Sequence, residues 1–183
     1  MDKLKNEYDI TVRWRAFPLH PDTPEEGLTL EQLFANRPVD INEIRRRLKD
    51  KAAELGLPLG ERKKTYNSRL AQELGLWAES KNRGDAFHMA AFKAYFVDGK
   101  NIAKIPVLLD LAESVGLPRE ETETVLSTRS FKDPVDEDWA ISNAKGITAV
   151  PTFMINKDKL VGAQPYETLE KFISANGVKK TEE

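Results

Sequence analysis

The sequence predicts an α/β protein in which an all-helical block interrupts a smaller part that contains the strands. Two observations lead to this class. Almost everything from Leu28 to about Arg129 has the apolar spacing of helices. A strand-like alternation precedes this block, and a helix–strand–strand–helix pattern follows it. The 183 residues suffice for one domain, or for one domain with an insertion, around a sizeable core.

The first strand is expected at Ile10–Phe17, where Ile10, Val12 and Trp14 alternate with polar residues. Prolines at 18, 21 and 24 then indicate an extended connector.

Helices are expected over the ranges 41–55, 67–81, 84–97, 106–116 and 119–129. The first has Asp40 as a plausible N-cap and Gly56 as its stop. Apolar residues go almost all round the helix at 84–97, which predicts burial on more than one side. We expect Trp14, Trp77 and Trp139 to be core residues.

The last part of the chain changes character. A helix is expected at Asp133–Lys145, followed by a hairpin of strands Val150–Ile155 and Leu160–Ala163 with a polar turn between them. An amphipathic helix at Gln164–Ala175 closes the pattern, with Pro165 at its first position.

Composition excludes several classes of protein. There are 28 Lys and Arg against 30 Asp and Glu, a net charge of −2, which gives no support for a nucleic-acid partner. The chain has no cysteine, and this excludes disulfides, cysteine-ligated zinc, iron–sulfur clusters and any thiol nucleophile of its own. Met1–Asp9 lacks the apolar core of a secretory signal, and no apolar run is long enough for a membrane span. We therefore expect a cytoplasmic protein without a membrane partner.

Most candidate polar sites have a plain structural interpretation. His20 and His88 are far apart in the chain, so they indicate a loop residue and a half-buried helix residue rather than a metal site. The basic runs Arg45–Arg47 and Arg62–Lys64 are interpreted as solvated surface, because acidic residues surround them. No phosphate loop or catalytic triad spacing is present, and we expect no metal and no cofactor.

Five separated segments resemble one known family, in the family's order. They are Trp14–Asp22 (WRAFPLHPD), Asn67–Leu74 (NSRLAQEL), Gly84–His88 (GDAFH) with Ala94–Phe96, Gly146–Phe153 (GITAVPTF) and Gly162–Pro165 (GAQP). The chain resembles the DsbA-like thioredoxin-fold family from about Tyr8 to Ile173, and within it the FrnE-type branch of thiol–disulfide oxidoreductases. The resemblance implies a thioredoxin-like domain from residues 1–22 and 133–176, a helical insertion at 23–132 and a tail at 177–183.

The same resemblance implies a substrate-facing wall. In the family the X–Pro bond matching Val150–Pro151 is cis, and its backbone pairs with a bound peptide or with glutathione. Val150, Pro151 and Thr152 are therefore the expected substrate-binding residues. Asn67 and Ser68 join them, since an Asn at the matching place helps to position substrate in the isomerase branch.

The departure from the family is equally informative. Family members begin with a strand and a Cys-x-x-Cys at a helix N-terminus, whereas this chain begins where that helix should be ending, around Lys3–Tyr8. We expect the chain to be redox-silent, because no thiolate is present. The missing strand would be central, between the strand at Ile10–Phe17 and the one at Pro151–Ile155, and without it the facing edges of both lack hydrogen-bond partners. We expect one of three solutions: the two strands close on each other, a second subunit donates a strand, or the missing segment exists upstream.

Three functions remain open at this stage. The first is a DsbA- or FrnE-type oxidoreductase scaffold. The second is a relative of the 2-hydroxychromene-2-carboxylate isomerases, which use glutathione. The third is a non-enzymatic module that binds peptides through the cis-proline wall. The expected partner is a peptide or small thiol, and homodimerisation is a hypothesis motivated by the unpaired strand edges.

Overall fold

The computed structural model describes residues 1–35 and 38–181 and divides into two compact units. Unit 1 combines Met1–Leu19 with Glu137–Glu183, and unit 2 is His20–Asp136. Each unit is described by itself. No helix within the described residues is long and apolar enough to cross a membrane.

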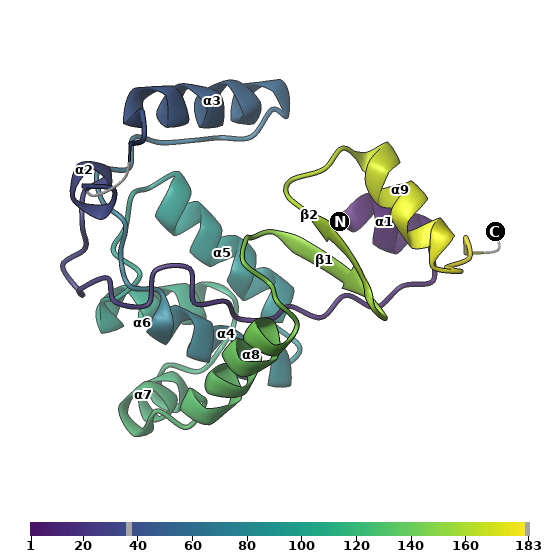
Figure 1. Ribbon diagram of the computed structural model, residues 1–183. Coiled ribbons are helices and arrows are strands. Elements are labelled where there is room, and N and C mark those ends of the chain that lie inside the picture. Colours follow the sequence, from purple (N-terminus) through teal and green to yellow (C-terminus); the bar gives the residue numbers. More distant parts are fainter. Residues whose placement is uncertain (36–37, 182–183) are drawn as a thin grey trace. The chain divides into compact units, whose positions relative to one another are not determined.

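Unit 2 is helical throughout its regular elements (Figure 1). Its helices are α2 (Leu30–Leu33), α3 (Ile41–Glu54), α4 (Arg69–Ser80), α5 (Gly84–Phe96), α6 (Ile105–Ser114), α7 (Arg119–Thr128) and the start of α8 (Lys132–Ala144). The helices expected from spacing lie within a few residues of these bounds. The predicted cap of α3 is confirmed, because an Asp40 carboxylate oxygen accepts the Glu43 N–H at 3.0 Å. Gly56 then has a positive φ of 64°, a conformation that suits glycine.

The main hydrophobic core of unit 2 lies among α4, α5, α6 and α7. Leu74, Phe87 and Leu108 are completely buried there, and Trp77 is 4% exposed. The burial of helix 84–97 is not complete, because Met89 and Phe92 are 65% and 42% exposed. Helices α4 and α6 pack against α5, and the side chains of Phe87 and Ala94 are buried.

Unit 1 contains α1 (Asp2–Glu7), β1 (Thr152–Ile155), β2 (Asp158–Val161), α9 (Tyr166–Ala175) and most of α8. The strands form an antiparallel hairpin in which Ile155 pairs with Asp158, so the turn is shorter than predicted. Asn156 takes the left-handed conformation in this turn at φ 53°, which Asn tolerates better than most residues. Strand β1 begins after Pro151, which has no N–H to give to a ladder. Leu4 and Tyr8 are buried with Ile173 of α9.

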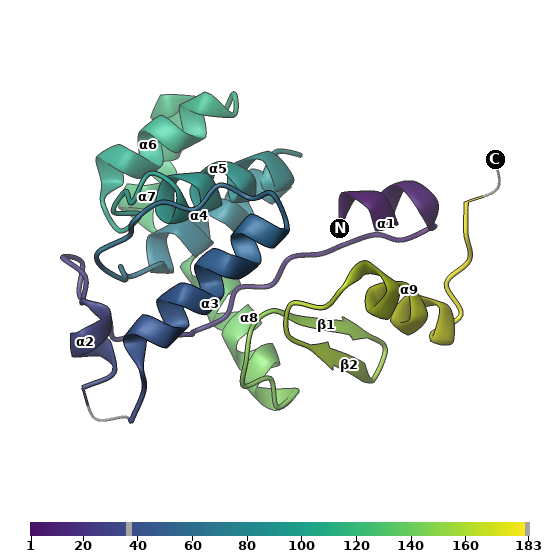
Figure 2. The same cartoon turned by 90° about the horizontal axis from the view of Figure 1, so that it is seen from above.

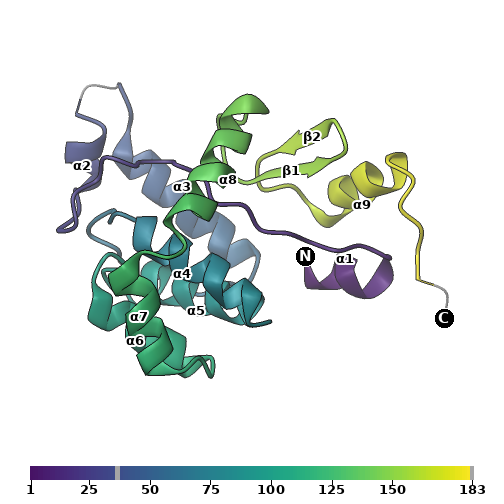
Figure 3. The same cartoon turned by 90° about the horizontal axis from the view of Figure 1, so that it is seen from below.

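The strand predicted at Ile10–Phe17 does not form. Its alternation survives, since Ile10, Val12 and Trp14 are half-buried and the residues between them exposed. Within the described part of the chain, however, the sheet has two strands, β1 and β2, and neither pairs with this segment. Figure 3 shows it as an extended trace. A β-strand is defined by backbone hydrogen bonds to a neighbouring strand. A segment whose side chains alternate between half-buried and exposed, but which has no neighbouring strand, is therefore only extended backbone.

The segment after α9 packs back onto unit 1. Tyr8 and Lys180 form an isolated antiparallel bridge, and the Asp9 N–H donates to the Lys179 carbonyl at 3.1 Å. The last two residues of the tail expected at 177–183 lie outside the described residues.

Candidate functional site

The loop between α8 and β1 holds the expected substrate-binding residues 150–152. Helix α8 ends before Gly146, and the Ile147 N–H donates back to the Ser142 carbonyl at 2.9 Å. The Val150–Pro151 peptide bond is cis. The Thr152 hydroxyl donates to the Ala149 carbonyl at 2.7 Å, which closes the loop on itself.

The outer edge of β1 is open. The Gly162 N–H donates to the Pro151 carbonyl at 2.8 Å, so the pair 151/162 is a hydrogen-bonded pair of the hairpin. Bonded and non-bonded pairs alternate along an antiparallel ladder, and the main-chain groups of Thr152 and Met154 therefore point away from β2. These groups have no backbone partner within the described residues. Val150, at the start of this edge, is 45% exposed.

A cavity of about 370 Å³ lies in the same unit. It is lined by Phe17, Pro18, Trp139, Ala140, Ser142, Asn143 and Ile147. Trp139 and Trp14 are half-buried, so the expectation that all three tryptophans are core residues holds only for Trp77. Most of the lining is apolar, which suits an apolar side chain of a ligand.

The extended segment before Pro18 is fixed to α8 by one buried carboxylate. The side chain of Asp138 is 3% exposed and accepts a hydrogen bond from Arg15 at 2.5 Å. Its second oxygen accepts the Ala16 N–H at 3.0 Å. The arginine in the sequence Trp14–Leu19 is thus an anchor of this segment.

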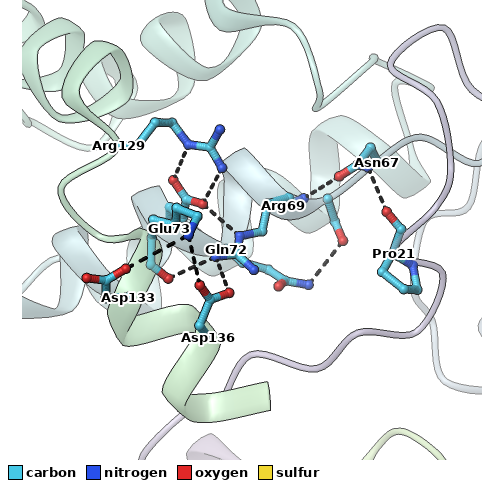
Figure 4. Close-up of polar contacts among 10 residues, drawn as sticks. Pro21, Asn67, Arg69, Gln72, Glu73, Arg129, Asp133 and Asp136 are labelled. Atoms are coloured by element: carbon cyan, nitrogen blue, oxygen red, sulfur yellow. Dashed lines mark hydrogen bonds and ion pairs between the residues drawn. The ribbon is translucent and has the colours of Figure 1, made fainter. Parts of the chain in front are cut away.

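The remaining expected site residues, Asn67 and Ser68, lie in unit 2 just before α4. The Asn67 amide donates to the carbonyls of Pro21 and Thr23, at 3.1 and 2.7 Å. Its oxygen accepts the Arg69 N–H at 2.8 Å (Figure 4). Asn67 therefore ties the Pro21–Thr23 connector to the start of α4. The Ser68 hydroxyl accepts a hydrogen bond from Gln72 at 3.1 Å.

A buried ion-pair network follows directly on α4. The Glu73 side chain is 2% exposed and accepts from Arg69 Nε at 2.7 Å. Two Arg129 nitrogens bind the same carboxylate, at 2.6 and 2.7 Å. Arg69 also pairs with Asp136 at 2.7 Å (Figure 4). Arg129 has a left-handed backbone, with φ 53°, at the end of α7.

The network sets the charge of its own members. Burial would raise the pKa of the Glu73 carboxyl, but hydrogen bonds from Arg129 and Arg69 outweigh it and lower that pKa. The hydrogen bond from Arg69 likewise lowers the pKa of Asp136. A cavity of about 250 Å³ is lined by Asn67, Arg69, Arg129, Glu25, Leu70 and Ala103. Its two arginines are already neutralised by Glu73 and Asp136.

Sequence reasoning missed this network. The Arg69–Glu73 pair has the i,i+4 spacing that favours contact on a helix, and that signal was available. Arg129 is 56 positions from Glu73, and no local pattern joins them.

Both histidines occupy structural positions. The ring of His20 meets the ring of Phe34 edge to face, with centroids 6.2 Å apart. His88 is half-buried on α5, and this burial lowers its pKa. Within the part of the chain that the structure describes, no group of three or more His, Asp or Glu is placed to hold a metal ion.

Comparison with known proteins agrees with this fold. The model of the DSBA-like thioredoxin domain matches residues 1–174. The uncharacterized protein YwbO of Bacillus subtilis is 30% identical over 177 residues, which cover 94% of this chain and 85% of YwbO.

Two solved structures share the fold. A probable DsbA oxidoreductase from Streptomyces coelicolor superposes with a TM-score of 0.81 at 24% identity, over 92% of this chain and 76% of that one. A 2-hydroxychromene-2-carboxylate isomerase superposes with a TM-score of 0.73 at 20% identity, over 96% and 84%. The family match covers nearly the whole chain, and this protein therefore belongs to the DsbA-like thioredoxin-domain family.

Proposed function

We propose that this chain binds an extended peptide backbone along the open edge of β1, beside the cis-proline loop of a DsbA-like scaffold. The observations that carry the proposal are the exposed Val150 beside the cis Val150–Pro151 bond, and the edge at Thr152 and Met154, which has no strand partner within the described residues. An extended peptide laid against such an edge gains main-chain hydrogen bonds without any particular side chain. The proposed binding residues are Val150, Pro151 and Thr152.

The surroundings of the edge supply a basis for selectivity. Val150 is exposed at the start of the edge, where it can contact the ligand. Ile147, in the same loop, lines the apolar cavity of unit 1. A ligand with an aliphatic or aromatic side chain would bury that group in this cavity and gain affinity from the apolar area removed from water.

The chemistry of the bound ligand is a separate question. These 183 residues hold no cysteine, and thiol–disulfide exchange requires a thiolate nucleophile. We infer that the chain by itself recognises peptide or thiol substrates without exchanging disulfides. The finer assignment, to the FrnE-type branch, is supported by the sequence Trp14–Leu19.

The isomerase alternative has less support from the polar groups. It requires Asn67 to position a substrate, whereas the Asn67 amide already donates to Pro21 and Thr23 and its oxygen accepts from Arg69. Positioning of a substrate by Asn67 would have to displace contacts that fix the start of α4.

The test compares two proline substitutions on opposite edges of the hairpin. Met154→Pro removes an outward N–H from β1, and Val161→Pro removes an outward N–H from the other edge, on β2. A fluorescent unstructured peptide with aromatic residues is the first probe, and glutathione is the second. Loss of one main-chain hydrogen bond predicts about tenfold weaker peptide binding for Met154→Pro. Val161→Pro serves as the matched control and should change the affinity less than about twofold.

Circular dichroism establishes that both variants are folded. Equal loss of affinity in the two variants would contradict the assignment to the β1 edge, and so would failure of both probes to bind the unmodified chain. An insulin-reduction assay addresses the redox inference separately, since turnover by this chain would refute it.

A further inference from the structure

Helix α3 is an amphipathic helix whose apolar side is largely exposed within the part of the chain that the structure describes. None of its residues is buried. Ile44, Leu48 and Leu55 are 38%, 45% and 57% exposed. In Figure 1 the helix stands apart from α4 and α5, and Figure 2 shows its whole length on the outside of unit 2. An isolated helix of this length is marginal in water and normally gains its stability from packing of the apolar side.

The apolar residues form one narrow stripe. Successive residues are about 100° apart around a helix, and this places Ile41, Ile44, Leu48, Ala52 and Leu55 within an arc of about 80°. The large apolar residues of the stripe are Ile41, Ile44, Leu48 and Leu55, which follow each other at intervals of 3, 4 and 7 residues. Such intervals are typical of helices that bind in the groove of a partner protein.

Basic residues border the stripe on both sides. The same geometry places Arg45 and Lys49 along one border and Arg47 and Lys51 along the other. The three acidic residues of α3 lie farther from the stripe than these cations, with Asp50 nearly opposite it and Glu43 and Glu54 beyond Arg47 around the helix. The four bordering basic side chains of α3 therefore lie nearer to the apolar stripe than the acidic ones do, which the run Arg45–Arg47 does not show by itself.

These border cations are available to a partner. Arg45 pairs with Glu31 of α2 at 3.1 Å, and Lys51 pairs with Glu54 at 2.8 Å. Both pairs are exposed, and such pairs are held weakly, by about 0–1 kcal/mol. Arg47 and Lys49 have no carboxylate partner within the described residues.

Charge decides what can cover the stripe. In a second copy paired antiparallel through α3, equivalent borders would face each other, so Arg45 and Lys49 would meet their own counterparts and repel them. A lipid surface is a poorer match, because the stripe is narrow and carries no aromatic side chain. An apolar groove with carboxylates along both rims would cover the stripe and neutralise both borders.

We propose that α3 is a docking helix for a partner protein whose apolar groove is bordered on both sides by acidic residues. This site is distinct from the proposed peptide edge, which lies in unit 1. Its failure or success therefore carries no information about the function proposed above.

The test uses a synthetic helix that has this chemistry. The probe is an acidic heptad peptide with leucine at positions a and d and glutamate at e and g, and the control probe has lysine at e and g. Titration calorimetry with the full chain should show binding of the acidic peptide at least about tenfold tighter than binding of the lysine peptide.

Two neighbouring arginines supply matched variants. Arg47→Glu alters a border of the stripe, and Arg46→Glu makes the same change in net charge on the back of the helix. We expect about tenfold weaker binding of the acidic peptide for Arg47→Glu and less than about twofold for Arg46→Glu. Leu48→Asp should abolish binding, and Leu48 is exposed enough for the chain to remain folded.

Three binding results and one result on dimerisation would overturn the proposal. The binding results are equal binding of the two peptides, equal effects of Arg46→Glu and Arg47→Glu, and binding to phosphatidylserine vesicles with none to the acidic peptide. Concentration-dependent dimerisation that Leu48→Asp removes would also contradict it, in favour of a second copy.

Discussion

Replacement of Glu73 by Gln tests the buried ion-pair network of unit 2. The Glu73 side chain is 2% exposed and binds two arginines, of which Arg69 is 16% exposed and Arg129 41%. Glutamine retains the shape but removes the charge, so Arg69 keeps only the more exposed Asp136 as a carboxylate partner. Loss of one member of a fully buried pair costs about 3–5 kcal/mol. Because Arg129 can turn its charge to water, we expect the free energy of unfolding to fall by about 2–3 kcal/mol.

Chemical denaturation at neutral pH measures this loss, and thermal unfolding should show a melting temperature lower by about 2–4 °C per kcal/mol. Glu121→Gln is the control, since it removes an exposed pair with Lys81 and should cost less than about 1 kcal/mol. The pKa of Glu73 is lowered in the folded state, so its contribution is present above the unfolded pKa and is lost as the pH falls. The difference between wild type and Glu73→Gln should shrink as the pH falls below about 4.5. A difference that is absent at pH 7, or that grows in acid, would refute the reasoning.

Two further substitutions test the packing of each unit. Leu74→Ala empties a fully buried position in the core of unit 2 and should lower the free energy of unfolding by about 2–5 kcal/mol, whereas Leu57→Ala, at a side chain 58% exposed, should cost less than about 0.5 kcal/mol. Comparable losses in urea titrations of the two variants would contradict the placement of the core. Asp138→Ala removes the acceptor for both Arg15 and the Ala16 N–H. We expect a loss of about 1–3 kcal/mol and faster hydrogen exchange at the Ala16 amide, and unchanged exchange there would disprove the anchor.

Much of the fold could be predicted from local patterns. A helix shows its apolar spacing and its ends within a short stretch of chain, so α3 could be placed between the Asp40 cap and Gly56 from the sequence alone. The hairpin was predictable for a similar reason, although its register needed the backbone of Asn156 and the missing N–H of Pro151. Family membership followed from separated segments that occur in one order.

The errors concern features that depend on a distant neighbour. Ile10–Phe17 has the alternation of a strand, but strand pairing requires a second segment, and neither described strand lies against it. The apolar circumference of α5 indicated burial on more than one side, but it did not show that Met89 and Phe92 stay exposed when α4 and α6 pack against the helix. In both cases the residue types indicate that a segment prefers a half-buried environment. They do not indicate which helix or strand packs against it.

The sequence by itself determined the family, the helices and the absence of a thiol among these residues, because each depends on residue type and near spacing. Only the tertiary structure decided which polar groups already have hydrogen-bond partners and which edges and apolar surfaces stay exposed. In the folded chain the amide of Asn67 is already hydrogen-bonded, and Arg129 binds Glu73 across 56 positions. Among the described residues, the β1 edge has no strand partner and no residue of α3 is buried. The reason is physical, since hydrogen-bond satisfaction and burial are set by what the folded chain brings alongside a residue.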